Sequence, residues 1–384
     1  MLEPLAASFI STAERTTCKA GPRYRFHPRE EIMSTKLILL LLVICFCAYP
    51  LPASTYWVGS CHAGSFPTIS AAVTSPNVAA GSTINICAGG YVEQVIISKS
   101  LTLQGLSNST QSGASILAPS SLQTTPSAIM SRYLLAPVIW VTAGTVNISN
   151  VSVTVTGAAQ LTSSDTAVGF YYAGGSSGTL NHVAFSGIGQ PQSSVGMWVE
   201  NQFLSATSVT IENSYSAAGI FAGSLAKLPT LTVQINGNQI YQTATPSGTW
   251  GVELYSVNGT VNTNFISGPR WSGTPPVGII AYGVLDDGLV PTNVTISGNT
   301  IQITDDWLYE FDYESWGIAL AVDGATVKSN RISGAEFGVD MECHAGTVSG
   351  NTLSNVTYGI SDVPSGFTGV NSFFNTPSKV SGGC

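Results

Sequence analysis

Residues 327–360 decide the fold: VKSNRISGAEFGVDMECHAGTVSGNTLSNVTYGI. Two short phrases alternate in this stretch. One consists of Val, two residues, Asn, one residue and an aliphatic residue, and the other of an aromatic residue, Gly and an aliphatic residue. Each phrase returns after 21 residues. This period is too short for helix-pair repeats or propeller blades, and it is typical of one coil of a parallel β-helix.

Both phrases also occur earlier in the chain. The asparagine phrase begins at Ile235, Val261, Ile296, Val327 and Val348. The aromatic phrase begins at Trp250, Tyr282, Trp316, Phe337 and Tyr358. Because the two phrases alternate strictly, we interpret them as parts of one repeating structural unit.

The repeated asparagine predicts a ladder of side-chain amides. At a turn between strands, Asn tolerates left-handed backbone angles, and its amide can pair with the Asn one coil away. Buried amides need partners and stacked amides supply them, which favours a structural role over ligand binding. We also expect the aromatic residues before each Gly to form an offset stack, in preference to a platform for sugars. The predicted rungs are Asn213, Asn238, Asn264, Asn299, Asn330 and Asn351.

The composition agrees with a solenoid of short strands. Of 384 residues only 9% are charged, 44% are hydrophobic and 40 are Gly. Ser, Thr, Asn, Gly and Val dominate, which favours strands joined by tight turns over amphipathic helices. The hydrophobic content also excludes a disordered chain.

Residues 64–106 carry the strongest resemblance to a known family. Their first part, residues 66–73, has helical spacing and predicts a cap on the N-terminal end of the solenoid. Three strands follow, at residues 83–87, 95–97 and 101–103. This segment resembles the opening coil of the pectate-lyase-like right-handed β-helix superfamily, including its pectinesterase branch. The residues that carry the resemblance are Phe66, Thr68, Ile69, Ala72, Val73, Gly81, Thr83, Ile84, Gly90, Glu93, Val95, Ile97, Leu101, Thr102 and Leu103.

The resemblance and the repeats together predict an all-β chain, a single-stranded right-handed parallel β-helix with a short N-terminal capping helix. We expect one domain over residues 54–384, with roughly a dozen coils. Residues 33–53 have the layout of a secretory signal peptide, with Lys36 followed by a short apolar run and small residues. Residues 1–32 are then an upstream extension outside the native start. An uncleaved N-terminal anchor is the alternative.

Charge restricts the partners. Residues 54–384 contain seven Lys and Arg against seventeen Asp and Glu, a formal charge of −10. An acidic exported protein is a poor nucleic-acid binder. We expect a secreted, periplasmic or cell-surface monomer that contacts polysaccharide, with no nucleic-acid partner and no membrane insertion after signal cleavage.

Four cysteines remain beyond residue 53. In an oxidising compartment an even number favours disulfides. We favour Cys61 with Cys87, which would join the N-terminal cap to the first coil, and Cys343 with Cys384, which would fasten the C-terminal tail. A metal site is the competing interpretation, and the absence of close Cys-x-x-Cys or Cys-His spacing disfavours it.

Two insertions interrupt the period on adjacent coils. Asn264 and Asn299 are 35 residues apart, and Asn299 and Asn330 are 31 apart, against 21 for the next interval. Insertions on a rigid solenoid are places where a site can be built. Aromatic faces beside carboxylates suit carbohydrate binding and glycosidic chemistry. The candidate catalytic residues are Asp286, Asp287, Asp305, Asp306 and Arg270, and the candidate substrate-binding residues are Trp271, Trp307, Tyr309 and Glu253.

The same insertions have a plainer interpretation, as loops that only shield the side of the solenoid. Four acids, Glu253, Asp286, Asp340 and Asp362, follow Gly-aliphatic pairs and could form an acidic row on neighbouring coils. Stacked carboxylates repel one another, which motivates calcium as a possible ligand of this row. No other cofactor is indicated.

Catalytic sets of the related enzymes do not transfer to this chain. Polygalacturonases carry Gly-His-Gly and Arg-Ile-Lys elements, and both are missing here. Pectate lyases use an Arg base, for which Arg270 is the one basic residue near the acids. His182 and His344 have no Ser or Cys nucleophile at a recognisable elbow.

Two functions therefore stay open. The chain binds or processes polysaccharide, as a polyuronate lyase or a glycoside hydrolase, or it is a non-catalytic structural or adhesive β-helix protein of the cell surface.

Overall fold

The computed structural model describes residues 53–107, 113–131, 133–157, 161–162, 165–188, 194–225, 230–241, 250–269, 276–283, 293–304 and 314–384. The chain divides into two units, Met1–Leu51 and Pro52–Cys384, and the described residues belong to the second. The predicted upstream extension lies outside the described residues, as does the predicted signal peptide except Ala53. No helix within the described ranges is long and apolar enough to cross a bilayer.

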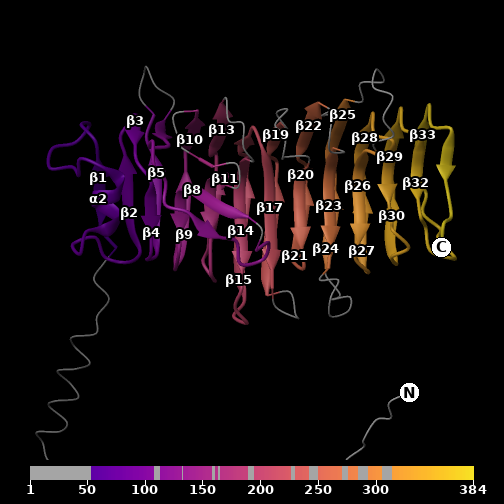
Figure 1. Ribbon diagram of the computed structural model, residues 1–384, viewed down its shortest axis with the longest axis horizontal. Coiled ribbons are helices and arrows are strands. Elements are labelled where there is room, and N and C mark those ends of the chain that lie inside the picture. The colour runs from indigo at the N-terminus through magenta and orange to yellow at the C-terminus, as the bar shows by residue number, and fades with distance from the viewer. Residues whose placement is uncertain are drawn as a thin grey trace, which may run out of the picture. The chain divides into compact units, whose positions relative to one another are not determined.

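The second unit is a parallel β-helix, as predicted. Each coil contributes one strand to each of three parallel sheets, which we name A, B and C in the order in which the chain visits them. Figure 1 shows the coils side by side, from β1 to β33. Each sheet has 11 strands on its main path, and β7 is an additional strand of sheet C, which agrees with the prediction of roughly a dozen coils. Parallel strands are joined in the right-handed sense in nearly all proteins, so the expected winding is right-handed.

From β2 to β32 the strands follow the chain in the rotation A, B, C, apart from the additional strand β7. Sheet A consists of β1 (Thr55–Val58), β2 (Ser82–Ile86), β5 (Leu101–Gly105), β9 (Thr145–Ser149), β12 (Ser177–Asn181), β15 (Thr207–Glu212), β18 (Leu231–Asn236), β21 (Asn258–Asn262), β24 (Val294–Ser297), β27 (Ala325–Lys328) and β30 (Gly346–Ser349). Sheet B consists of β3 (Gly89–Val92), β6 (Ala114–Leu117), β10 (Val151–Thr156), β13 (Ala184–Ile188), β16 (Tyr215–Ser216), β19 (Gln239–Tyr241), β22 (Phe265–Pro269), β25 (Thr300–Thr304), β28 (Arg331–Ser333), β31 (Thr352–Ser354) and β33 (Ser372–Phe374). Sheet C consists of β4 (Val95–Ile97), β8 (Leu134–Val141), β11 (Asp165–Tyr172), β14 (Ser194–Asn201), β17 (Gly219–Ser224), β20 (Trp250–Tyr255), β23 (Val277–Tyr282), β26 (Trp316–Ala321), β29 (Phe337–Asp340), β32 (Tyr358–Ser361) and β34 (Ser378–Val380), and β7 (Thr125–Pro126) pairs antiparallel with β8.

The core fills the inside of the coils. Strands of sheets A and B alternate buried and more exposed residues, because one face of each strand points inward and the other outward. Inward Val, Ile and Leu side chains from all three sheets form one continuous cluster. In sheet C, β11 and β14 are buried on both faces. Residues outside sheet C must therefore cover the outer face of β11 and β14.

The predicted N-terminal cap is present as α2 (Ile69–Thr74). Thr68 begins the helix, because its side chain accepts a hydrogen bond from the Ala71 amide at 3.1 Å. The Glu93 carboxylate accepts the amides of Ile69 and Ser70 at 2.9 and 2.8 Å. Glu93, one of the residues that carried the family resemblance, thus ties the cap to the first coil.

The asparagine ladder is confirmed. Each rung donates its side-chain nitrogen to the side-chain oxygen of the next rung, at 2.9 to 3.0 Å, over Asn238, Asn264, Asn299, Asn330, Asn351 and Asn371. The backbone amide of each of the first five rungs donates to the same oxygen at 2.9 Å. The five rungs from Asn238 to Asn351 are buried. The ladder lies at the turn from sheet A to sheet B.

Three details of the ladder differ from the prediction. Asn213 is not a rung: Ser214 holds that position, and its amide donates to Asn238 Oδ1 at 3.0 Å. Asn371, which the repeats did not predict, is the last described rung. The left-handed angles fall on the residue before each rung from Asn238 to Asn351, as at Gly237 (φ 65°) and Thr263 (φ 53°). Asn213 (φ 50°) belongs to that preceding column, where a short polar side chain or Gly tolerates this conformation.

The aromatic column is confirmed in part. Trp316, Phe337 and Tyr358 are stacked at centroid separations of 6.0 and 5.0 Å. Tyr282 does not belong to this column, because Val277 pairs with both Trp250 and Trp316. In this coil the residues equivalent to the aromatic-Gly-aliphatic phrase are therefore 277–279. The similar phrase at Tyr282, five residues later, matches the repeat by chance.

Both predicted disulfides are present. Cys61 is bonded to Cys87 and Cys343 to Cys384, with Cα atoms 5.7 and 5.5 Å apart. The first joins the loop after β1 to the end of β2. The second joins the loop after β29 to the last residue of the chain.

Loss of one ladder amide should destabilise the solenoid strongly. In Asn330→Ala the backbone and side-chain nitrogens of Asn299 lose their shared acceptor, and the carbonyl of Ile296 loses a donor. Leaving buried polar groups unpaired costs about 1–3 kcal/mol each. We expect the free energy of unfolding in urea to fall by about 3 kcal/mol. Asn147→Ala, at an exposed position on β9, is the control and should change it by less than about 0.5 kcal/mol.

The Gly of the aromatic phrase should not accept a side chain. A Cβ at Gly338 would lie 2.6 Å from the carbonyl oxygen of Gly359 and would overlap Leu353. Overpacking of this kind typically costs about 1–3 kcal/mol. We expect Gly338→Ala to lower the unfolding midpoint clearly, whereas Gly382→Ala, with no atom nearby, should not. Equal midpoints for the two variants would contradict this account of the repeat.

Candidate functional site

The coils differ in length mainly at the corner between sheets B and C. Short connections follow β28 and β31, where sheet C resumes at Phe337 and Tyr358. Long connections separate β19 from β20, β22 from β23 and β25 from β26. The longest described one joins β6 to β8 and contains β7. The insertions predicted from the spacing of the ladder are thus real and occur where coils leave the regular repeat.

Most of the predicted site residues belong to these connections. Arg270 and Trp271 follow β22 and precede β23. Asp305, Asp306, Trp307 and Tyr309 stand between β25 and β26. Asp286 and Asp287 stand between β23 and β24, at the other end of the sheet C strand. All eight lie outside the described residues, so the roles given to them stay predictions.

Chain order relates all of these residues to one part of sheet C. Arg270 and Trp271 precede β23, Asp286 and Asp287 follow it, and the predicted residues between 305 and 309 precede β26. Glu253 lies on β20, which is hydrogen-bonded to β23. The outer face of sheet C over β20, β23 and β26 is therefore the surface that these residues border in sequence, and we name it the sheet C site.

Glu253 lies on the outer face of the sheet C site but is buried. It is 3% exposed and pairs in register with Phe221 on one side and Ile280 on the other. Such burial does not favour the direct substrate contact predicted for it. The next carboxylate in the same register is Asp340, reached through Ile280 and Ala319.

The predicted acidic row is wrong for its described members. Three strand spacings separate Glu253 from Asp340, about 14 Å. Asp340 pairs with Ser361, so Asp362 lies one position beyond the row. Asp286 lies outside the described residues. The sequence suggested a row because each acid follows a Gly-aliphatic pair, but the offset after the pair differs between coils.

Asp340 is instead held by local donors. The indole nitrogen of Trp316 donates to Asp340 Oδ2 at 3.2 Å, and the Glu342 amide donates to Oδ1 at 3.2 Å. Burial, together with the charges of Asp340 and Asp362, raises the pKa of Glu342, and His344 opposes this shift. In the described part of the chain no group of three or more His, Cys, Asp or Glu is placed to hold a metal ion. Calcium binding stays a prediction.

Aromatic side chains continue along the outer face of sheet C toward the N-terminus. Trp140 stacks with Tyr171 at 6.1 Å, and Trp198 stacks with Phe221 at 4.2 Å. Phe221 in turn lies 6.5 Å from the half-buried Trp250. These rings belong to a second apolar cluster, separate from the core inside the coils.

The connection from β6 to β8 covers this second cluster. We name its described residues, 118–131 and 133, the strap. Ile129, Met130 and Tyr133 of the strap pack against the cluster, and the Tyr133 ring lies edge-on to Trp198 at 5.9 Å. The strap explains why β11 and β14 are buried on both faces.

A buried carboxylate anchors the strap. Glu200 Oε2 accepts the Ala128 amide at 2.9 Å and the Tyr171 hydroxyl at 3.1 Å, and Oε1 accepts the Trp198 indole at 2.6 Å. The Ser127 hydroxyl also donates to Oε1. Burial, and then the charge of Glu200, raise the pKa of Tyr171 far above its ordinary value, so its hydroxyl remains a donor.

Sequence reasoning missed Glu200. The signal was a lone acid in the apolar strand VGMWVEN (residues 195–201), at the outward position two residues after Trp198. With four donors around it, Glu200 joins the strap to β11 and β14 and is occupied by structural hydrogen bonds. The strap thus seals the N-terminal half of the aromatic surface, and the sheet C site lies beyond it.

Three solved structures are similar to this chain in part. No protein-family model matches the sequence, and no curated protein matches it. The chain is similar in structure to the GH136 lacto-N-biosidase of Eubacterium ramulus (10% identity, TM-score 0.46, covering 84% of this chain and 68% of that one). It is also similar to the tailspike gp49 of Acinetobacter baumannii bacteriophage Fri1, a capsular polysaccharide depolymerase (11%, 0.40, 78% and 57%).

A third similar structure is PfbA, a surface adhesin of Streptococcus pneumoniae (15% identity, TM-score 0.39, covering 72% of this chain and 84% of that one). At these identities and TM-scores the likeness carries no conclusion about activity or superfamily. The parallel β-helix rests on the strand pairing itself, and the resemblance to the pectate-lyase-like superfamily stays a prediction.

Replacing the anchor of the strap should loosen it. In Glu200→Gln an NH₂ group replaces one of the two carboxylate oxygens that now accept hydrogen bonds. At least one buried donor then lacks an acceptor, which costs about 1–3 kcal/mol of stability. We expect faster hydrogen exchange at the Ala128 and Met130 amides, with the ladder strands unaffected. Glu212→Gln on sheet A is the matched control. Unchanged exchange in the strap would show that apolar packing alone holds it.

Proposed function

We propose that this chain is an exported parallel β-helix protein that engages polysaccharide at the sheet C site. The observation that carries the proposal is the place of the long connections in the chain, next to adjacent strands of sheet C. Residues predicted to bind or process a glycan flank β23 at both ends and precede β26. Long connections from a rigid scaffold are where binding and catalytic residues are concentrated in proteins.

The floor of the site supports binding of sugar rings. Half-buried aromatic side chains lie at its margins: Trp250 on β20, Tyr282 on β23 and Trp316 on β26. Tyr255 and Tyr282 meet edge to face at 4.9 Å. Aromatic faces pack against the C–H face of a pyranose ring, and the phenol groups can exchange hydrogen bonds with its hydroxyls.

Catalysis is a further part of the proposal. Glycosidases place two carboxyl groups about 5–5.5 Å apart for retention or about 6.5–9.5 Å apart for inversion. Glu253 and Asp340 are too far apart for either arrangement. A catalytic pair would therefore be drawn from Asp286, Asp287, Asp305 and Asp306. Arg270 is the candidate base of a lyase, acting on a uronate.

We infer export from the two disulfides and from the signal-like segment. Two disulfides form and persist in oxidising compartments. The signal-like segment at residues 33–53 would direct the chain there. We place the mature protein outside the cytoplasm, secreted, periplasmic or on the cell surface.

A polysaccharide panel tests this proposal. The purified chain is mixed with polygalacturonate, alginate, xylan, mannan and insoluble cellulose, and reducing ends and unsaturated uronates are measured. New reducing ends alone indicate a hydrolase, unsaturated uronates a lyase, and retention without turnover a binding protein. Absence of both retention and turnover on every polysaccharide would overturn the proposal.

The variants Asp286→Asn/Asp287→Asn and Asp305→Asn/Asp306→Asn locate the chemistry. General acid and base groups contribute about 10²–10⁴-fold to a rate. We expect at least one double variant to lose turnover by about 100-fold or more while its thermal unfolding stays unchanged. Glu212→Gln on sheet A serves as the control and should retain full turnover. Full turnover in both double variants would remove these four acids from the reaction.

A further inference from the structure

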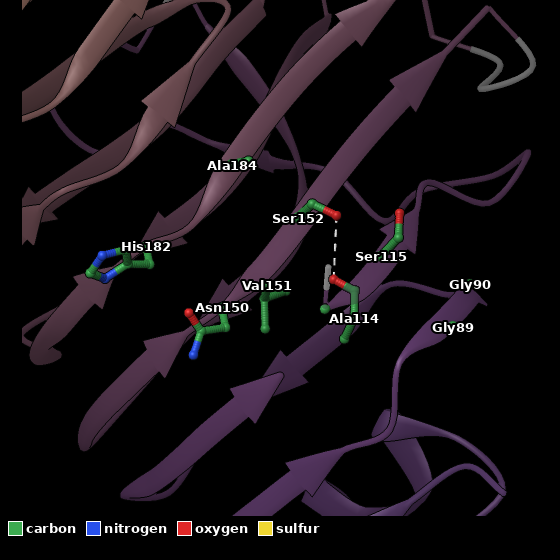
Figure 2. A pocket seen from close by; sticks show the side chains of 10 residues that line it. Gly89, Gly90, Ala114, Ser115, Asn150, Val151, Ser152, His182 and Ala184 are labelled. Carbon is green, nitrogen blue, oxygen red and sulfur yellow. Dashed lines mark hydrogen bonds between the residues drawn. The ribbon is translucent and has the colours of Figure 1, made fainter. Parts of the chain in front are cut away.

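The outer face of sheet B carries a groove that is unrelated to the sheet C site. Figure 2 shows this groove, which spans the first strands of the sheet and has a volume of about 600 Å³. Its floor comes from β3, β6, β10 and β13, through Gly90, Ser115, Ser152 and Ala184. His182, at the turn before β13, lies at one side of it.

The groove exists because outward residues of one register row are small. Gly90 pairs with Ser115, Ser115 with Ser152, and Ser152 with Ala184. The next residue in the same row is Tyr215, which pairs with Ala184. A row of small side chains thus ends at an aromatic ring, and the row runs across the strands, along the axis of the solenoid.

Three aromatic rings follow on successive coils. Tyr215, Tyr241 and Phe265 come from β16, β19 and β22. Their centroids are 5.6 Å apart in both pairs, Tyr215 to Tyr241 and Tyr241 to Phe265. Tyr215 is 40% exposed and Tyr241 37%. Phe265 is partly buried. Cross-strand aromatic pairs stabilise a sheet, but that role alone does not require two neighbouring rings to be this exposed.

Charge distinguishes this face from the rest of the protein. Residues 54–384 have a formal charge of −10, yet among the described strands of sheet B the only charged residue is Arg331. Outward neighbours of the rings carry amides and hydroxyls: Gln239, Ser267, Thr300 and Gln302. A face without carboxylates, rich in neutral donors and acceptors, suits a ligand that is polar and uncharged.

The geometry points to the outer face of sheet B as a second glycan site, for a neutral polysaccharide chain lying along the solenoid axis. Sugar rings pack on Tyr215, Tyr241 and Phe265, and the groove from Ala184 to Gly90 receives the following units of the same chain. Spacing of the aromatic rings by one coil each matches a polymer better than a single sugar. This site does not depend on the sheet C site, whose predicted catalytic residues include four acids.

Direct binding measurements on the full chain test the inference. The probes are soluble mannan, xylan and β-glucan, with polygalacturonate as the charged comparison, followed by isothermal titration. The variant Tyr215→Ala/Tyr241→Ala should bind the neutral probe at least tenfold more weakly. Tyr215→Phe/Tyr241→Phe keeps the rings and should retain most of the affinity. Phe374 is a more accessible aromatic residue (60% exposed) at the far end of the same sheet, and Phe374→Ala should bind as the wild type does.

Binding in the groove is tested by a separate variant. Ser152→Trp fills its floor with a ring on an outward position, so it should weaken binding of long chains several-fold while leaving a short oligosaccharide of the same sugar unaffected. Asp305→Asn/Asp306→Asn should leave binding of the neutral probe unchanged, which separates this site from the sheet C site. Binding of polygalacturonate alone, no binding of any neutral probe, or full affinity in the folded Tyr215→Ala/Tyr241→Ala variant would overturn the inference.

Discussion

The hydrogen bond from each ladder asparagine to the next is the interaction on which the other features depend. It fixes the turn from sheet A to sheet B at the same position in every coil from Asn238 to Asn371. A one-residue slip in a strand would exchange its inward and outward faces. Because the ladder prevents such slips, residues of one register row stay aligned over many coils. The stack of Trp316, Phe337 and Tyr358 in sheet C lies within these coils and follows from that alignment.

The structure divides the outer surface of the solenoid into faces with different chemistry. Sheet C carries aromatic rings that are sealed by the strap toward the N-terminus and half-buried beyond it. Two of its carboxylates, Glu200 and Asp340, accept hydrogen bonds from neighbouring donors. Sheet B carries exposed rings and almost no charge. The same coils thus present a sheet C face with buried carboxylates and a sheet B face whose described strands carry none.

The period and the ladder could be predicted from sequence because both are local patterns repeated at a fixed spacing. The errors arose where two residues of similar chemistry stood near the same register position. Asn213 precedes the true rung, Ser214, and Tyr282 imitates a triplet that belongs to Val277. Glu200 could not be assigned at all, since its partner Ala128 is 72 residues away and no local pattern marks the pair. For the predicted acids the sequence gives chain position, whereas their mutual distances depend on connections outside the described residues.

The uneven corner between sheets B and C has a consequence for how such a protein can change. A loop between the end of a sheet B strand and the start of the next sheet C strand has both ends fixed by those strands, whatever its length. Loop closure becomes only slowly more costly as a loop grows. New binding loops can therefore be exchanged at this corner without disturbing the neighbouring coils. That makes the solenoid a promising frame for grafting binding loops by design.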